Sequence, residues 1–175
     1  MEQLPAFRYH PDPLRTGSIR SSEKECRSCG RRRGYIYMGP VYARDELREA
    51  LCPWCIASEE AATRFDAMFS DDYSLLQANV GPDVVTEVTR RTPGFCGWQQ
   101  EAWLVHCRNA CAFHGDAEVD ELLTEEARTQ LAGVDGVPED RWVQFIESYR
   151  PGGNPAVYVY QCLVCGAQRF QLDFT

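Results

Sequence analysis

Several features that would assign the chain to a common protein class are missing from it. No apolar run approaches the roughly 20 residues that a membrane-spanning helix needs, so a transmembrane helix is excluded. The first residues show no basic stretch followed by an apolar one, so no secretory signal is expected and the predicted location is cytoplasmic. Gly-rich phosphate loops, nucleophile elbows and His-Glu-x-x-His patterns are also missing, which argues against the enzyme classes that depend on them.

Positive charge is scarce and unevenly placed. Lys24 is the single lysine, and the 175 residues carry a formal net charge of −8, which argues against a general nucleic-acid binder. Residues 1–34 nevertheless hold eight basic and four acidic residues, so the rest of the chain carries an excess of twelve negative charges. An acidic protein with a basic N-terminal segment is therefore predicted.

Cysteine, in contrast, is abundant, with nine residues in the chain. In a reducing compartment paired cysteines favour metal binding over disulfides, and an odd number cannot pair completely. Cys26/Cys29 and Cys52/Cys55 form two Cys-x-x-Cys pairs with 22 residues between them. Because two intervening residues let both sulfurs of a pair reach one ion at about 2.3 Å, the four cysteines predict a structural zinc site.

The order of elements around this first site indicates its architecture. The knuckle at Cys26–Cys29 is followed by 34–42, which we expect to form a hairpin around Gly39-Pro40, and then by a second pair entering a helix. This order predicts a treble-clef-like lobe. The alternatives are buried free cysteines and a redox dithiol at Cys52/Cys55, but no β-α-β pattern precedes that pair and a matching first pair exists.

The remaining cysteines predict a second site. Cys107 and Cys111 would share one face of a helix that we expect to begin at Trp98, and Cys162/Cys165 form a knuckle between two strands. The simplest partition joins these four cysteines around a second structural zinc ion. The alternatives are completion of Cys162/Cys165 by His106 or His114, another pairing of the cysteines, and burial of Cys107 and Cys111 as small apolar residues. Cys96 is left over, and we expect it to pack in the fold rather than to react.

Periodicity elsewhere predicts an α+β fold. Helices are expected over 45–51, 56–69, 98–108 and 117–131 and after Pro82 and Pro138, and strands over 157–161 and 169–174. We predict one compact domain over 1–175. Its parts are an N-terminal zinc lobe over about 1–69, a helical part over about 80–150 and a C-terminal zinc-knuckle hairpin over about 155–175.

Four long strings of the sequence resemble those of one known family. The strings are Phe7-Arg8-Tyr9-His10-Pro11-Asp12-Pro13, Gly34-Tyr35-Ile36-Tyr37 with Gly39-Pro40-Val41-Tyr42, Leu51-Cys52-Pro53-Trp54-Cys55-Ile56-Ala57, and Thr92-Pro93-Gly94-Phe95 with Gly97-Trp98-Gln99-Gln100-Glu101. They resemble the CbrC family, uncharacterised bacterial proteins whose name is associated with colicin tolerance. The resemblance is strong over about 5–115. It implies no catalytic residue, because the family has no established biochemical activity.

The leading functional hypothesis is a zinc-binding, non-catalytic interaction protein, related to stress or toxin tolerance, whose acidic surface suits a basic protein partner. A candidate partner surface lies near Pro93-Gly94 and comprises Trp98, Gln99, Gln100, Glu101 and Trp103, although burial of the two tryptophans in the core is the competing interpretation. One alternative is nucleic-acid binding through the basic N-terminal zinc lobe, where Arg31-Arg32-Arg33 follows the knuckle. The other is an enzyme of unknown reaction using Trp98, Gln99 and Glu101. His10 is expected to hydrogen-bond within the fold.

Overall fold

The computed structural model describes residues 2–134 and 137–175, and it mixes helices with two antiparallel sheets. The predicted helical part of 80–150 includes residues 135 and 136, which lie outside the described residues. A two-stranded sheet joins β1 (Ile19–Ser21) to β2 (Tyr35–Tyr37). A four-stranded sheet has the order β3 (Val105–His106), β4 (Asn109–Asp116), β5 (Ala156–Cys162) and β6 (Gln168–Asp173). The predicted mixture of helix and sheet is confirmed.

The helices are short and fall into two groups along the chain. Before the four-stranded sheet lie α1 (Pro53–Ala57), α2 (Glu60–Phe65), α3 (Tyr73–Gln77) and α4 (Pro82–Arg91). Between β4 and β5 lie α5 (Val119–Leu122), α6 (Glu125–Leu131), the 3₁₀ turn η1 (Glu139–Arg141) and α7 (Trp142–Ser148). Within the described ranges, no helix has both the length and the apolar character that crossing a membrane would take.

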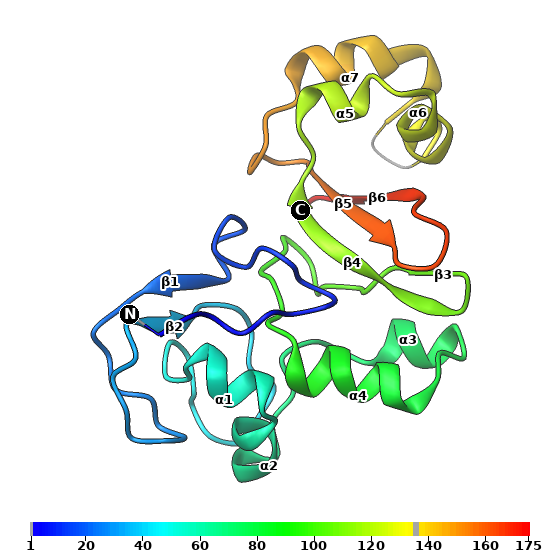
Figure 1. The fold of residues 1–175 in the computed structure, drawn as a ribbon. Coiled ribbons are helices and arrows are strands. Elements are labelled where there is room, and N and C mark those ends of the chain that lie inside the picture. Colours follow the sequence, from blue (N-terminus) through cyan, green and yellow to red (C-terminus); the bar gives the residue numbers. More distant parts are fainter. Residues whose placement is uncertain (1, 135–136) are drawn as a thin grey trace.

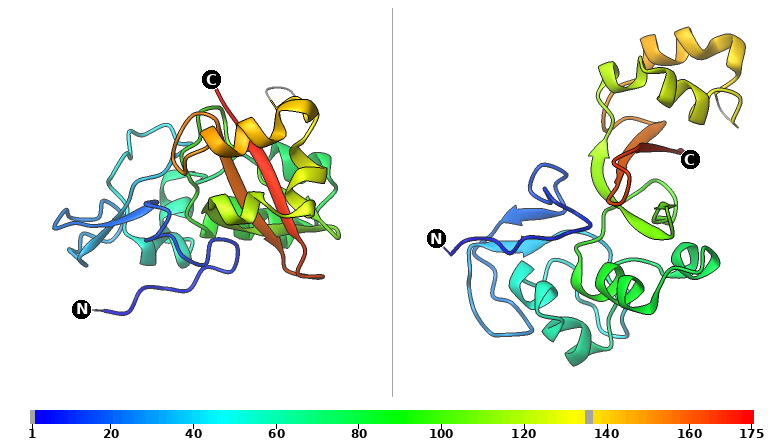
Figure 2. Two further views of the ribbon diagram at one scale, coloured as in Figure 1. Left: turned by 90° about the horizontal axis from the view of Figure 1, so that it is seen from above. Right: turned by 45° about the vertical axis from the view of Figure 1, so that its right-hand side comes forward.

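Both faces of the four-stranded sheet are covered, which explains why β5 is buried along almost its whole length. Tyr158 and Tyr160 face a core shared with α3 and α4, whereas Val157 and Val159 face a core shared with α5, α6 and α7. Figure 1 shows these layers, with α5–α7 on one side of the sheet and α4 on the other. The right-hand view in Figure 2 shows the same arrangement.

The N-terminal lobe has its own core, and cysteines lie at its centre. Cys26, Cys52 and Cys55 are buried together with apolar residues from β1, β2, α1 and α2. The lobe lies beside the layered part, with the β1–β2 sheet next to α1 in Figure 1. The two β-strands and the two helices therefore enclose the sulfur atoms within an apolar core that also holds Phe69, Ile56 and Leu51.

Several local predictions in the N-terminal lobe are wrong. The expected hairpin over 34–42 does not form, because β2 pairs with the earlier strand β1 and Tyr42 pairs with Met68 instead. The expected helix over 45–51 is irregular chain. The expected helix over 56–69 is divided, with Glu59 at φ 63 between α1 and α2. The predictions for 34–42 and 45–51 depend on local sequence patterns alone. In the structure both segments instead form hydrogen bonds with parts of the chain that are distant in the sequence.

The prediction of a helix over 98–108 is also wrong, and this error affects the second cysteine site. The segment is irregular up to β3, and residues 107 and 108 form the two-residue turn of the β3–β4 hairpin. Trp103 is held in this extended course because its ring packs in the core and its Nε1 donates to the carbonyl of Cys111, 2.8 Å away. The expected helix over 117–131 is interrupted at Thr124, whose side chain caps α6.

Candidate metal centres

The first cysteine cluster is assembled as predicted from two distant pairs. We define cluster 1 as Cys26, Cys29, Cys52 and Cys55, whose sulfur atoms all lie within 4.8 Å of one another. The Cys26–Cys55 and Cys29–Cys52 sulfur pairs are 3.9 Å apart, and the Cys52–Cys55 pair is 3.5 Å apart. A tetrahedral ion with bonds of about 2.3 Å separates its sulfur ligands by about 3.8 Å. Cluster 1 could therefore hold a metal ion.

The backbone around Cys26 and Cys29 has a conformation that suits metal binding by this pair. The N–H of Gly30 donates to the carbonyl of Cys26 at 2.7 Å, and the N–H of Cys26 donates to the carbonyl of Arg31 at 3.0 Å. Gly30 has φ +68, a left-handed conformation that a side chain would disfavour. The N–H of Cys52 also points at the Cys26 sulfur, 3.2 Å away, and such donors stabilise a thiolate.

Electrostatics within cluster 1 also fit a cation. The hydrogen bond from Cys52 lowers the pKa of the Cys26 thiol, and the same contact raises the pKa of Cys52. Burial raises the pKa of Cys55 to about 12. Four thiolates cannot share so small a volume unless a positive charge balances them, since like charges at this distance suppress further ionisation. A divalent ion would supply that charge.

The second cluster differs from the predicted ligand set in one member. We define cluster 2 as His106, Cys107, Cys162 and Cys165, whose ligand atoms lie within 4.8 Å of one another. His106 Nδ1 is 3.3 Å from the Cys107 sulfur and 3.4 Å from the Cys165 sulfur. These distances are close to the roughly 3.5 Å between nitrogen and sulfur ligands on a tetrahedral ion. Cluster 2 could hold a metal ion through one imidazole and three thiolates.

The structure places Cys111 outside this group. Cys111 lies on β4 opposite Cys162, is fully buried, and packs in the core between the sheet and α4. Burial raises its pKa to about 12, so the thiol stays neutral. The prediction that paired it with Cys107 assumed a helix, in which residues four apart share a face. In the hairpin that forms, His106 takes this place, as in the alternative in which His106 or His114 completes the Cys162/Cys165 pair.

The turn that carries Cys107 is conformationally unusual. Cys107 and Arg108 have φ 51 and φ 58, the left-handed values that a two-residue hairpin turn requires and that asparagine and glycine usually supply. On the other side of the cluster, burial acts to raise the pKa of Cys162. Hydrogen bonds from the backbone of Cys165 and Val164 and from the side chains of His106 and Cys165 together lower it to about 6. A metal bond to Cys107 would help to hold this strained turn.

Comparison with known proteins places the chain in a family. The profile of UPF0167, described as an uncharacterised protein family, matches residues 4–174. The chain belongs to the UPF0167 family. It is 52% identical over 175 residues to UPF0167 protein PA1536 of Pseudomonas aeruginosa, with 98% of each chain covered. It is 46% identical over 178 residues to UPF0167 protein Mb2317 of Mycobacterium bovis, covering 99% of this chain and 95% of that one. No solved structure matches it.

The predicted membership of the CbrC family is wrong. The family match and both relatives bear the UPF0167 description, and none bears the CbrC name. The strings around Pro11, Pro40, Pro53 and Pro93 that suggested the resemblance are therefore features of a UPF0167 protein. None of these matches supports an association with colicin tolerance.

The candidate partner surface of this UPF0167 chain is largely engaged by the fold. Trp103 is buried, and Glu101 accepts hydrogen bonds from the hydroxyl of Tyr42 at 2.8 Å and from the N–H of Asp71 at 3.1 Å. The backbone N–H groups of Trp98 and Gln99 both donate to the carboxylate of Asp173. The Gln100 side chain donates to Asp71 at 2.8 Å, and the Trp98 side chain remains 49% exposed.

Acidic neighbours neutralise much of the basic N-terminal segment. Lys24 pairs with Glu49 at 2.6 Å, and Arg27 pairs with Asp45 at 3.5 Å. Arg33 pairs with Glu2, and its guanidinium lies 4.2 Å from the centroid of the Trp54 ring. Only Arg31 and Arg32 of the arginine run are exposed. Cys96, predicted to pack in the fold, is exposed instead.

Proposed function

We propose that this UPF0167 protein is a zinc-stabilised, non-catalytic binding protein whose two clusters hold one structural Zn²⁺ each. The observation that carries the proposal is the convergence of four ligand atoms, within 4.8 Å of one another, in each of two places. Thiolate and imidazole ligands in sets of four suit zinc better than calcium or magnesium, which take oxygen ligands. Four protein ligands also leave no position for a substrate, so the proposed role of both ions is to hold the fold.

A treble-clef-like lobe is the finer proposal for cluster 1. The order of a knuckle, a strand and a helix-borne second pair supports it, because Cys52 directly precedes α1 and Cys55 lies within it. The strand β2 pairs with β1 rather than with a following strand, so the lobe departs from the usual hairpin. For cluster 2, the proposed ligand set replaces the predicted Cys111 by His106.

Metal analysis of the purified protein tests the zinc proposal directly. We expect close to two zinc ions per chain after dialysis against metal-free buffer, with Cys52→Ala and Cys165→Ala each reducing the number to one. The matched control is Cys96→Ala, which removes an exposed cysteine outside both clusters and should keep two ions. A zinc content near zero in the wild-type protein would contradict both sites, and a content of one would contradict cluster 2.

The proposed binding partner is a basic protein. Acidic residues are concentrated on the exposed surface of the two helices that follow β4, where Glu118, Asp120, Glu125 and Glu126 are all exposed. Opposite charge accelerates association and favours basic partners, with a strong dependence on salt. Exposed Leu123, at 68%, adds an apolar contact beside these charges.

Affinity capture from the native host tests this partner. A basic protein retained at low salt should be lost when Glu125 and Glu126 are both changed to Gln, and retained when the exposed pair Glu23 and Glu25 is changed in the same way. Retention that is indifferent to both pairs and to salt would contradict the proposal. The nucleic-acid and enzyme alternatives have less support, because Arg33 and Glu101 are already engaged within the fold.

A further inference from the structure

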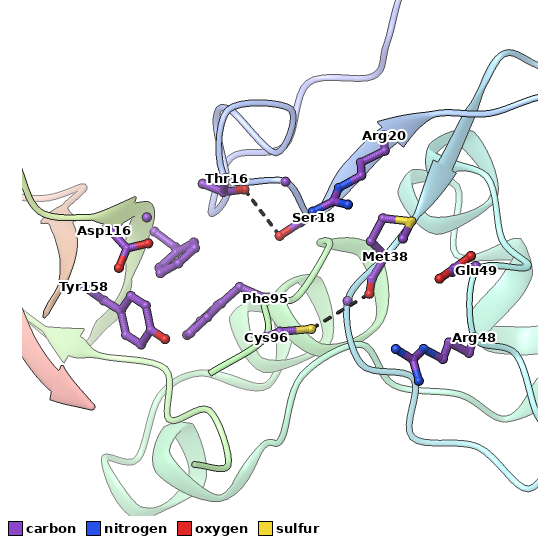
Figure 3. A pocket seen from close by; sticks show the side chains of 14 residues that line it. Thr16, Ser18, Arg20, Met38, Arg48, Glu49, Phe95, Cys96, Asp116 and Tyr158 are labelled. Atoms are coloured by element: carbon purple, nitrogen blue, oxygen red, sulfur yellow. Dashed lines mark hydrogen bonds between the residues drawn. The ribbon is translucent and has the colours of Figure 1, made fainter. Parts of the chain in front are cut away.

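A cavity of about 380 Å³ lies where the N-terminal lobe meets the four-stranded sheet (Figure 3). Its walls come from segments that are far apart in the chain, including β1, the residues after β2, the 95–96 segment, β4 and β5. None of the residues that line it belongs to either cysteine cluster. Clefts between two packed units are common positions for small-molecule sites.

One side of the cavity is cationic. Arg20 and Arg48 both line it, and Figure 3 shows them on the same side, across the cavity from Asp116. Among the described residues neither arginine takes part in an ion pair. The carboxylate of Glu49 also lines the cavity, and it pairs with Lys24, 2.6 Å away. Because Glu49 is paired with Lys24, the two guanidinium groups leave this side with an excess of positive charge that can receive an anionic group.

The opposite side of the cavity carries the carboxylate of Asp116, whose position depends on a β-bulge in β4. The pairing of β4 with β5 shifts register between Phe113 and Gly115, and Gly115 has φ +89. Such bulges redirect the side chains that follow them, and here the next residue is Asp116. Its Oδ1 atom is buried and has no hydrogen-bond partner in the described structure. A buried carboxylate oxygen without a donor is unfavourable, so a donor from a ligand would stabilise it.

The floor between these charged ends is aromatic and rigid. The rings of Phe95 and Phe113 are stacked with centroids 3.8 Å apart, and Tyr158 packs edge-on against both. The hydroxyl of Tyr158 donates to Asp173 at 3.1 Å, which fixes the ring in place. Tyr158 is also the register partner of Asp116, so the two side chains share one face of the sheet. This floor suits a short carbon chain rather than a further charge.

We propose that this cavity binds a small zwitterion, with its phosphate or carboxylate group at Arg20 and Arg48 and its ammonium group at Asp116. The ligand would span the floor with its carbon chain. The site is independent of the zinc proposal, since neither cluster contributes to it.

Calorimetric titration of the full-length, metal-loaded protein with four small probes tests the proposal. O-phosphoethanolamine and β-alanine carry both charges, ethyl phosphate carries only the anion, and ethanolamine only the cation. We expect at least one zwitterion to bind about tenfold or more tightly than either singly charged probe, because each end makes a charge-assisted contact. The comparison of O-phosphoethanolamine with β-alanine shows whether the anionic group is phosphate or carboxylate.

Matched variants separate the two ends of the site. Asp116→Asn should remove the advantage of the zwitterion over ethyl phosphate, and Arg48→Met should weaken both probes about tenfold or more. Arg32→Met replaces an exposed arginine that does not line the cavity and should change nothing. Each variant must keep the wild-type zinc content and circular dichroism spectrum. If one of the two variants loses the fold, Arg20→Met or Asp116→Glu takes its place.

The rate at which Cys96 is alkylated provides a second measurement of ligand binding in the cavity. Cys96 lines the cavity and is exposed, whereas Cys111 is buried and the other seven cysteines belong to the clusters. Iodoacetamide should therefore alkylate Cys96 first, and a bound zwitterion should slow that reaction. Failure of every probe to bind at millimolar concentration, equal binding of zwitterion and ethyl phosphate, or unchanged binding by both variants would overturn the proposal.

Discussion

The two cysteine clusters begin with the same turn and then differ. In each, the N–H of a glycine with positive φ donates to the carbonyl of the first cysteine, Gly30 to Cys26 at 2.7 Å and Gly166 to Cys162 at 2.9 Å. In each, the N–H of that first cysteine donates five residues forward, at 3.0 Å and 2.9 Å. The remaining ligands come from a helix start in cluster 1 and from a hairpin turn in cluster 2.

The second difference is enclosure. Three of the four cysteines of cluster 1 are buried and lie within the core of the N-terminal lobe. In cluster 2 only Cys162 is buried, while Cys107 and Cys165 are exposed at the end of a sheet that has two further apolar cores. The same knuckle therefore lies in the core of the N-terminal lobe in cluster 1, whereas in cluster 2 it joins two hairpins at the surface of the four-stranded sheet. We expect the ion in cluster 1 to be required for folding and the ion in cluster 2 to secure two hairpins locally.

Cys52→Ala should have the largest effect on stability. It removes one buried ligand and leaves three thiols without an ion inside the core of the N-terminal lobe. Structural zinc in small domains contributes about 10–16 kcal/mol of apparent binding free energy, which exceeds the ~5–15 kcal/mol stability of a typical domain. We expect the N-terminal lobe to lose its cooperative thermal transition in calorimetry. A variant that melts within a few degrees of the wild-type protein would show that cluster 1 is not required for the fold.

Cys165→Ala should have a smaller and more local effect. Loss of the ion would release the β3–β4 turn from the β5–β6 knuckle, and a cross-link between such loops is worth about 2–4 kcal/mol by analogy with a disulfide. Hydrogen exchange should accelerate over 105–110 and 161–168, while protection around Cys26 and Cys52 should not change. A chelator should also remove this ion first from the wild-type protein. Equal effects of Cys165→Ala and Cys52→Ala would remove the distinction between the two clusters.

His10 connects the N-terminal segment to the four-stranded sheet through contacts that involve no metal ligand, so this connection can be tested separately from the clusters. The ring nitrogens of His10 lie 2.7 Å from the Pro93 carbonyl and 2.7 Å from the Thr16 hydroxyl, and the ring packs edge-on against Phe113 of β4. These hydrogen bonds within the fold were predicted from the sequence. Burial lowers the pKa of His10 to about 4, below its ordinary value of 6.5.

The direction of the pH effect follows from that pKa. The unfolded chain binds a proton more tightly than the folded one, so stability is complete above pH 6.5 and declines as the pH falls toward 4. At pH 5 the loss should be about 2 kcal/mol. His10→Asn should be less stable at pH 7 but should lack this part of the decline, as measured by urea unfolding at each pH. Zinc release in acid affects both proteins and cancels in the comparison, and parallel pH profiles would contradict the assignment.

Local sequence patterns predicted cluster 1 but not the whole of cluster 2, and the difference has a physical cause. A Cys-x-x-Cys knuckle is defined by contacts within five residues, so Cys26/Cys29 and Cys162/Cys165 could be recognised without any knowledge of the fold. The alternating strands at the C-terminus were predictable for the same reason. The course of 98–108 depends instead on the burial of Trp103 and on a hydrogen bond to β4, which no local pattern contains. A helix over this segment favours Cys111 as the ligand, whereas the hairpin that forms brings His106 to the cluster.

The smallest predicted effect tests this last assignment. Cys111→Ala removes one buried sulfur atom from the core between the sheet and α4, and a change of this size usually costs about 1 kcal/mol. Because Cys111 lies outside cluster 2, the variant should retain two zinc ions per chain, whereas His106→Ala should retain one. Cobalt substitution adds a spectroscopic check, since thiolate-to-metal charge transfer should be unchanged in Cys111→Ala and altered in His106→Ala. Loss of an ion from Cys111→Ala with full retention by His106→Ala would restore the four-cysteine site and would make the two clusters alike in their ligands.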